Sequence, residues 1–229
     1  MYSLVTTSII QGIKSTPVYV EADVSNGMPV FEMVGFLASE VKESKERVRT
    51  ALKNSGILLP AKRITINFIP ANIRKTGSGF DLPIAIAVLA ALGLVPQDAL
   101  ENRMIIGEIS LNGDVKAVNG ILPLVAEARE RGITACIVPQ DNGQEAELVK
   151  NMEIYAVHDI KEVLYLLNGG IYEKKEEKEA EKEPQASVDF ADIQGQKALK
   201  RACEVAVSGM HNLLMVGPPG AGKTMTAMR

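Results

Sequence analysis

The stretch HNLLMVGPPGAGKTMTAMR, residues 211–229, joins an apolar run to a glycine-rich turn and then to helix-forming residues. Residues 217–224 match the pattern G-x-x-x-x-G-K-T. Glycines in such a turn let successive backbone N–H groups point at one spot, and the start of a helix adds its own free N–H groups there. We expect a strand at 213–216 and a helix after the turn, the context in which this pattern binds phosphate. The stretch therefore predicts the start of an α/β nucleotide-binding domain.

The ligand that this loop predicts is ATP together with Mg²⁺. We expect the Lys223 ammonium to lie against the terminal phosphates and the Thr224 hydroxyl to bind the metal. The alternative interpretation is a Gly–Pro turn that joins a strand to a helix and binds nothing. The residues expected to contact ATP are Gly217, Pro218, Pro219, Gly220, Ala221, Gly222, Lys223 and Thr224.

A charged segment precedes this region. Residues 173–185 read EKKEEKEAEKEPQ, with six Glu, four Lys and no apolar residue larger than Ala. A segment of this composition lacks the apolar surface needed to fold by itself. We therefore expect a charged linker at 172–187, which separates a first domain at 1–171 from a second domain at 188–229.

The first domain is predicted from its patterns of apolar residues. The Asn26–Gly27 pair lies between two apolar runs and predicts a hairpin that joins the second strand to the third. Helices and strands alternate in the second half, which predicts crossover units in a mixed sheet and an α+β fold class. The strands are expected at 4–13, 18–24, 30–34, 63–69, 104–109, 134–138 and 153–157, and the helices at 38–54, 82–92, 121–131, 143–150 and 160–167.

Composition limits the class of protein. Apolar residues make up 46% of the chain and aromatic residues 4%, which predicts an aliphatic core. Cys136 and Cys203 match no metal-ligand spacing, so both are expected to be small core residues. The chain has no apolar run of the roughly 18 residues that would span a bilayer and no secretory signal. A reduced cytoplasmic location is therefore expected.

The net charge of −3 hides a basic window. Residues 40–75 contain nine basic and three acidic residues, a charge of +6, so the remainder of the chain carries −9. On the expected helix at 38–54, Lys42, Arg49 and Lys53 lie on the side opposite the apolar stripe. A patch of this kind attracts polyanions, so these three residues are candidate contacts to nucleic acid. The alternative is an ordinary solvated helix face.

Several blocks of the sequence resemble the YifB/ComM family, the Mg-chelatase-like AAA+ proteins. DFADIQGQ at 189–196, HNLL at 211–214 and the GPPGAGKT loop are similar to the start of its ATPase domain. In the first domain, SNGMPVFEMVG, VKESKERVRTAL, SGILLPAKRITINFIPA and GFDLPIAIAVLAA are similar to its N-terminal domain. The resemblance implies that Ile193 and Gln196 line the adenine pocket. It also implies a bacterial cytoplasmic protein whose copies form a ring, a hexamer, that moves along DNA in uptake and recombination.

The N-terminal domain of this family resembles the proteolytic domain of Lon, which is itself similar to the second domain of a small-subunit ribosomal protein. Lon uses a serine nucleophile and a lysine base. Gly79 stands at the position of the serine and Leu122 at that of the lysine, so no peptidase activity is expected. Ser78 and Lys116 lie nearby in the sequence but not at the matching positions.

Three functions stay open at this point. The first is an ATP-driven motor acting on nucleic acid, for branch migration or unwinding. The second is the motor subunit of a metal chelatase, and the third is a non-catalytic scaffold with an inactive protease fold. The sequence ends five residues after Thr224, before any Walker B strand, sensor residue or arginine finger, so we expect a fragment that is incomplete as an ATPase.

Overall fold

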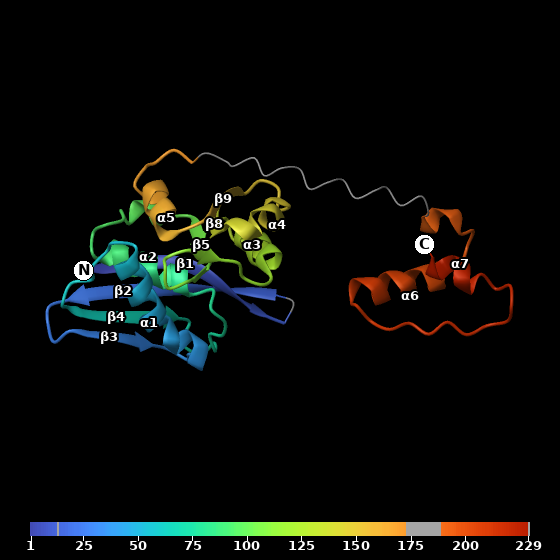
Figure 1. Ribbon diagram of the computed structural model, residues 1–229, viewed down its shortest axis with the longest axis horizontal. Helices are drawn as coiled ribbons and strands as arrows, with labels where there is room; N and C mark the ends of the chain where they lie inside the picture. The colour runs from blue at the N-terminus through green and yellow to red at the C-terminus, as the bar shows by residue number, and fades with distance from the viewer. Residues whose placement is uncertain (13, 173–188, 229) are drawn as a thin grey trace. The chain divides into compact units, whose positions relative to one another are not determined.

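The computed structural model describes residues 1–12, 14–172 and 189–228 (Figure 1). The chain divides into two compact units, Met1–Lys174 and Lys175–Arg229, and each is described by itself. The mixed α/β class expected from the sequence is confirmed in the first unit, where a seven-stranded sheet contains parallel and antiparallel pairs. Most of the linker expected at 172–187 lies outside the described residues. Tyr172 is described, and its hydroxyl donates to the carbonyl oxygen of Ala156 at 3.2 Å.

The first half of the unit builds one side of the sheet. Strands β1 (Tyr2–Gln11) and β2 (Lys14–Ser25) form an antiparallel hairpin. Strand β4 (Arg63–Ile69) pairs antiparallel with the other edge of β2, and β3 (Val30–Val34) pairs in parallel with β4. The resulting order is β3-β4-β2-β1-β5-β8-β9, with β3 at one edge.

The hairpin predicted at Asn26–Gly27 is wrong, because β2 and β3 are not neighbours in the sheet. Strand β4 lies between them, so Ile64 has Val24 on one side and Phe31 on the other. The alternate residues of β4 are buried on the core face, whereas β3 is only partly covered. Strand β4 therefore occupies the inner position, although it comes later in the chain.

The second half of the unit adds three parallel strands, as the alternating pattern predicts. These are β5 (Arg103–Ile105), β8 (Ala135–Pro139) and β9 (Glu153–Val157). Parallel neighbours need crossover connections, which the intervening segments provide with short helices. The helices of this half are α3 (Ile121–Glu130), α4 (Gly143–Glu147) and α5 (Ile160–Leu167).

The single strand expected at 104–109 is wrong, because the chain forms two short strands there. After β5, strand β6 (Glu108–Ile109) leaves the large sheet and pairs antiparallel with β7 (Val115–Lys116). The break lies at Gly107, where a Cβ atom would approach Cγ1 of Val115 at 2.8 Å. The backbone therefore passes too close to its neighbours for a side chain, and the strand bends away.

Two helices close the first half. Helix α2 (Asp81–Ala91) is buried along its whole length, because it packs on β1 and β2 and is covered by α1 (Ser39–Asn54) (Figure 1). Helix α1 buries Val41, Val48 and Leu52, as its spacing predicts. In the described part of the chain, no helix has both the length and the apolar character needed to cross a membrane.

The two cysteines are core residues, as predicted. Cys136 lies in β8 and Cys203 in α6 (Lys197–Ser208), and both side chains are buried. Burial raises the pKa of the Cys136 thiol to about 12, because a thiolate is poorly solvated there. Cys136 is therefore a protonated packing residue rather than a reactive one.

The second unit is helical in its described residues. It contains α6, α7 (Lys223–Ala227) and a 3₁₀ turn at Phe190–Asp192. The strand predicted at 213–216 is wrong: this segment is not a strand, and Leu214 and Val216 are 86% and 87% exposed. A strand is held by hydrogen bonds to a neighbouring strand, and residues 189–228 contain no other strand that could provide them.

Candidate functional site

The glycine-rich loop at 217–224 has the backbone geometry of a tight turn into a helix. Gly220 and Gly222 have φ angles of +80° and +78°, in the left-handed region that favours glycine. Helix α7 begins directly after them, at Lys223. The Lys223 ammonium folds back over the loop and donates hydrogen bonds of 2.8 Å to the carbonyl oxygens of Gly217 and Pro218.

The same loop presents free hydrogen-bond donors. Within residues 189–228, the N–H groups of Gly222, Lys223 and Thr224 have no acceptor, whereas the N–H of Thr226 donates to Gly222 at 2.9 Å. Free N–H groups are usual in the first turn of a helix and attract anions. Open space above Gly220 and Gly222, where a Cβ would meet nothing within 4 Å, leaves room for a bound group. The donors and the free space therefore fit a phosphate.

Ile193 and Gln196, the residues that the resemblance assigns to the adenine pocket, precede α6. Ile193 is buried and follows a 3₁₀ turn that is capped by the Asp189 side chain. Gln196 is the N-cap of α6 and has a φ angle of +50°. In the described part of this unit, no hydrogen bond joins either residue to the loop at 217–224. Their place in an adenine pocket stays a prediction.

The first unit has a cavity of about 250 Å³ where the sequence predicts an inactive protease site. Segments far apart in the chain line it: 8–10 in β1, 76–80 before α2 and 117–119 after β7, together with Ile106, Glu108 and Leu124. Gly79 forms part of the wall, and a Cβ on it would lie 3.5 Å from Cγ1 of Val118. Leu122 lies in the first turn of α3, outside the lining.

The serine and the lysine that lie near those positions each have another partner. The Ser78 hydroxyl donates to the carboxylate of Glu108 in β6. The Lys116 ammonium donates to Oδ2 of Asp114 at 2.9 Å, and both of these side chains are about half exposed. A serine nucleophile in a Ser–Lys pair needs a neutral lysine as its base. The geometry at Ser78 does not provide one.

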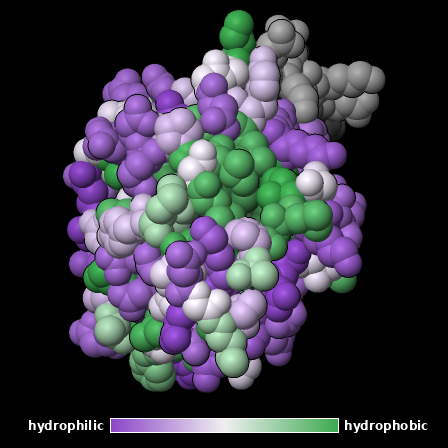
Figure 2. Space-filling model, turned by 90° about the vertical axis from the view of Figure 1, so that its left-hand side faces the viewer, coloured by the Kyte–Doolittle hydropathy of each residue, from purple (hydrophilic) through white to green (hydrophobic). Residues whose placement is uncertain are grey.

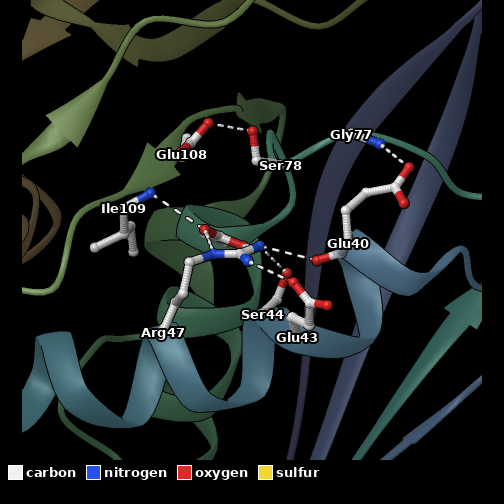
Figure 3. A network of polar contacts seen from close by, with 9 residues as sticks. Glu40, Glu43, Ser44, Arg47, Gly77, Ser78, Glu108 and Ile109 are labelled. Atoms are coloured by element: carbon white, nitrogen blue, oxygen red, sulfur yellow. Dashed lines mark hydrogen bonds and ion pairs between the residues drawn. The ribbon is translucent and has the colours of Figure 1, made fainter.

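An ion pair between the half-buried Arg47 and the buried Asp81 lies close to Ser78 and Glu108 of the cavity lining (Figure 3). Nε of Arg47 donates to Oδ2 of Asp81 at 2.7 Å, and Nη2 donates to Oδ1 at 3.0 Å. The same Nη2 donates to Oγ of Ser44 and to the carbonyl oxygen of Glu40, and the N–H of Ile109 donates to Asp81 at 3.4 Å. The hydrogen bonds with Asp81 raise the pKa of Arg47. The pair joins α1, α2 and β6.

Sequence reasoning missed this pair. In the sequence, Arg47 is one of the nine basic residues of the window at 40–75, and Asp81 directly precedes the apolar helix expected at 82–92. Two signals point to the pair: Arg47 follows the buried Ser44 by one helical turn, and Asp81 is the sole charged residue of an otherwise apolar helix. A charge at the start of a helix that is buried throughout requires a partner.

Lys75 was also counted in the basic window, but it is not available at the surface. Its side chain is completely buried, and its ammonium donates to the carbonyl oxygens of Ile73, at 2.8 Å, and Pro70. Desolvation lowers the pKa of Lys75. Its backbone joins the chain at Phe36 and Ala38 through bonds of 2.8 and 2.9 Å. Lys75 therefore holds the loop after β4 against the start of α1.

The basic surface is consequently smaller than the sequence window. Arg47 is paired with Asp81 and Arg63 with Glu32. The three candidate nucleic-acid contacts, Lys42, Arg49 and Lys53, are exposed on α1, and none of them makes an ion pair in the described part of the chain; Lys45 is half buried. Arg49 lines two neighbouring hollows of about 240 and 320 Å³, one shared with Lys62 and the other with Lys53.

Metal-binding side chains are not clustered in the described residues. No group of three or more His, Cys, Asp or Glu side chains is placed there to hold an ion. The Mg²⁺ expected at Thr224 is of another kind, because it would be held mainly by the phosphates of a nucleotide. Thr224 is exposed at the start of α7.

The sheet, the cleft at Gly79 and the glycine-rich loop define a class of protein: a Lon-protease-like domain followed in sequence by a segment of the magnesium-chelatase type. Residues 20–142 match the family described as subunit ChlI of Mg-chelatase, and residues 189–229 match that described as magnesium chelatase, subunit ChlI. Lon protease 2 of Bacillus subtilis is 34% identical over 127 residues, 55% of this chain and 22% of the protease.

Two further relatives are similar over nearly the whole chain. The competence protein ComM of Haemophilus influenzae is 38% identical over 223 residues, 95% of this chain and 44% of ComM. The uncharacterized protein YifB of Escherichia coli is 37% identical over 227 residues, 99% of this chain and 45% of YifB. The chain belongs to the YifB/ComM family of Mg-chelatase-like proteins. It spans less than half the length of these relatives.

Proposed function

We propose that this chain is part of an ATP-driven motor that acts on DNA. The observation that carries the proposal is the loop at 217–224, whose glycines and free N–H groups fit a phosphate and which lies in the segment matched to magnesium chelatase. ATP is the nucleotide that its G-x-x-x-x-G-K-T pattern favours. The activity belongs to the full-length protein, of which these residues form a part.

Each loop residue has a role in this proposal. The N–H groups of Gly222, Lys223 and Thr224 would hold the phosphates, with Gly217, Pro218, Pro219, Gly220 and Ala221 shaping the turn. The Lys223 ammonium would exchange its two carbonyl partners for phosphate oxygens, and the Thr224 hydroxyl would contact Mg²⁺. Mg²⁺ neutralises the phosphate charge. Ile193 and Gln196 would contact the adenine.

The DNA part of the proposal rests on the first unit. Lys42, Arg49 and Lys53 present unpaired positive charge on one helix face, and a relative is named for competence. Contacts of this kind bind phosphates without reading the sequence. We further propose that the bacterial protein works in the cytoplasm as a ring of identical subunits, a hexamer. Figure 2 shows an apolar area on the surface, which is of the kind that contacts another protein.

A second candidate is the motor subunit of a metal chelatase, which the descriptions of both matched families favour. It shares the ATP loop but needs no DNA contact. The third candidate, a non-catalytic scaffold, is favoured by the absence of a nucleophile at Gly79. The DNA motor differs from the other two candidates in that DNA changes its rate of ATP hydrolysis, and the scaffold differs from both motors in that it does not hydrolyse ATP.

The test uses the full-length protein. Phosphate release is measured with and without single-stranded DNA, and binding is measured with a fluorescent ATP analogue. Lys223→Ala is expected to lower hydrolysis roughly 100-fold or more, because it removes a charge that stabilises the transferring phosphate. Lys197→Ala, an exposed lysine of the same unit, is the control and is expected to change nothing. Unchanged hydrolysis in Lys223→Ala contradicts the ATP site, whereas a rate indifferent to DNA contradicts the DNA motor alone.

A further inference from the structure

Strand β1 lies between β2 and β5, but most of its side that faces β5 has no neighbouring strand. It pairs with β2 from Tyr2 to Gln11, but on its other side β5 contributes only the pair Thr6 and Met104. The side chain of Gln97 bonds both the N–H and the carbonyl oxygen of Leu4, at 3.1 and 2.9 Å, on that same side. In an antiparallel strand, every second residue directs both backbone groups to one side. Ser8 and Ile10 therefore direct their backbone N–H and carbonyl groups away from β2.

No other segment takes up these groups. Among the described residues, the backbone N–H and carbonyl groups of Ser8 and Ile10 have no hydrogen-bond partner. The chain after β5 turns aside, because Ile106 donates to Ile137 at 3.1 Å and Gly107 donates to Gly79 at 3.2 Å. The space beside Ser8 and Ile10 is the cavity of about 250 Å³. A strand edge with unpaired groups is a template for another strand.

The cavity has an apolar part and a negatively charged part. Ile106, Val118 and Leu124 form apolar walls, and Glu108 contributes a half-buried carboxylate that accepts from Ser78 (Figure 3). In the described residues Glu108 makes no ion pair, and the cations around it are already paired. Arg47 is bound to Asp81, and Lys116, directly opposite Glu108 in the β6–β7 pair, is bound to Asp114. Glu108 is thus the charged residue among the described residues that line the cavity, and it makes no ion pair with either cation, although its charge helps to raise the pKa of Arg47.

We infer that an extended segment of a partner protein adds to β1 at Ser8 and Ile10 and places a basic side chain beside Glu108. Donors and acceptors that repeat every second residue match the backbone of a strand, which is the basis of recognition by strand addition. The charge of Glu108 favours a lysine or arginine in that segment and repels a nucleic acid. None of the residues that line the cavity belongs to α1 or to the loop at 217–224, so this site is a separate surface from the one proposed for DNA and from the one proposed for ATP.

Amide hydrogen exchange tests the inference without a mutation. The probe is a fluorescein-labelled nonapeptide in which threonine and valine alternate around a central lysine, and its matched form has glutamate at the centre. In the 229-residue chain, the amides of Ser8 and Ile10 are expected to exchange fast and to slow by about tenfold or more when the lysine peptide saturates the protein. The amides of Thr7 and Ile9, which face β2, are expected to be slow in both states.

Substitutions test the two parts of the site separately. Glu108→Gln keeps the size of the side chain and is expected to weaken binding of the lysine peptide about tenfold, while removing the preference over the glutamate peptide. Ser8→Pro removes the free N–H, whereas its control Ser8→Ala keeps it. Both variants lose the hydrogen bond of 2.8 Å that the Ser8 hydroxyl donates to the carbonyl oxygen of Thr16 in β2, so that loss is matched between them. Binding is measured by fluorescence anisotropy, and the melting temperature is recorded for each variant.

A third test fills the cavity by a substitution outside β1. Gly79→Leu places a side chain into the space near Val118 and is expected to weaken binding of the lysine peptide about tenfold or more. Ala71→Leu, on an exposed loop, is the control. The inference is overturned if the lysine peptide does not bind. It is also overturned if the Ser8 and Ile10 amides do not slow at saturation, or if Ser8→Pro and Gly79→Leu, both folded, bind as the wild type does.

Discussion

Arg47 and Asp81 hold α1 against α2 through two parallel hydrogen bonds of 2.7 and 3.0 Å, and Asp81 is completely buried. Removing one partner of such a pair leaves a buried charge without compensation. We expect Arg47→Ala to lower the free energy of unfolding by about 3–5 kcal/mol. Arg63→Ala, which breaks an exposed pair with Glu32, is expected to cost less than about 1 kcal/mol.

Urea unfolding at neutral pH measures both values. The arginine variants are compared at equal ionic strength, because an exposed pair weakens with salt and a buried pair does so much less. Equal losses in Arg47→Ala and Arg63→Ala would show that the buried pair contributes no more than a surface contact.

Lys75 predicts a dependence of stability on pH. Desolvation lowers its pKa in the folded state below the ordinary value of 10.5, so between these two values the unfolded chain binds more protons. The free energy of unfolding is therefore expected to rise as the pH increases from the folded-state pKa of Lys75 to its ordinary pKa. The added stability is lost again as the pH falls through the folded-state pKa. Lys75→Met is expected to remove the effect, and Lys53→Met, on an exposed lysine, is expected to retain it. Urea unfolding across an alkaline pH series measures the slopes, and equal slopes in both variants would exclude Lys75 as the source.

The basic face of α1 predicts binding that is weakened by salt. Changing Lys42, Arg49 and Lys53 together to glutamate in the full-length protein is expected to weaken single-stranded DNA binding alike for all sequences. Each lost phosphate contact is expected to reduce the slope of log K against log salt by about 0.7. Anisotropy with a labelled oligonucleotide at several salt concentrations measures both quantities. The control changes the exposed Lys14, Lys150 and Lys161 to glutamate, which alters the net charge equally.

An unchanged affinity and salt slope in the α1 variant, together with an unchanged melting temperature, would return these residues to a solvated helix face. A loss that is equal in the two variants would point to net charge rather than to a located surface.

The cleft at Gly79 predicts no peptidase activity. Gly79 has no nucleophile, Leu122 has no base, and the hydroxyl of Ser78 is bound to a carboxylate rather than to a neutral lysine. Purified protein is expected not to hydrolyse casein or a fluorogenic peptide, and activity that persists in Ser78→Ala would be a contaminant. Hydrolysis that Ser78→Ala abolishes would contradict the prediction.

Much of the first unit could be predicted because its elements follow local patterns. The strands at 30–34, 63–69 and 153–157 and the helix at 160–167 have the predicted bounds, since alternation and helical spacing reflect burial directly. The prediction of a hairpin at Asn26–Gly27 was wrong because a turn signal does not determine which strand pairs with β2. The prediction of a strand at 213–216 was wrong because residues 189–228 contain no strand with which this segment could pair.

The sites divide in the same way. The loop at 217–224 is contiguous, so its pattern is visible in the sequence, and its ligand stays a proposal. The Arg47–Asp81 pair and the burial of Lys75 depend on residues that are brought together only by the fold. The positive charge counted along the window at 40–75 therefore exceeded what the surface presents.

The position of β4 between β2 and β3 affects the order in which the chain assembles as it leaves the ribosome. Strand β2 meets its first partner, β1, as soon as both have been synthesised, because they are consecutive. Strand β3 has no partner until α1 and β4 have followed it, since Phe31 aligns with Ile64. Long-range pairing of this kind forms late. During synthesis, β3 is therefore a largely apolar segment without a neighbouring strand until β4 emerges, and exposed apolar segments of this kind favour aggregation.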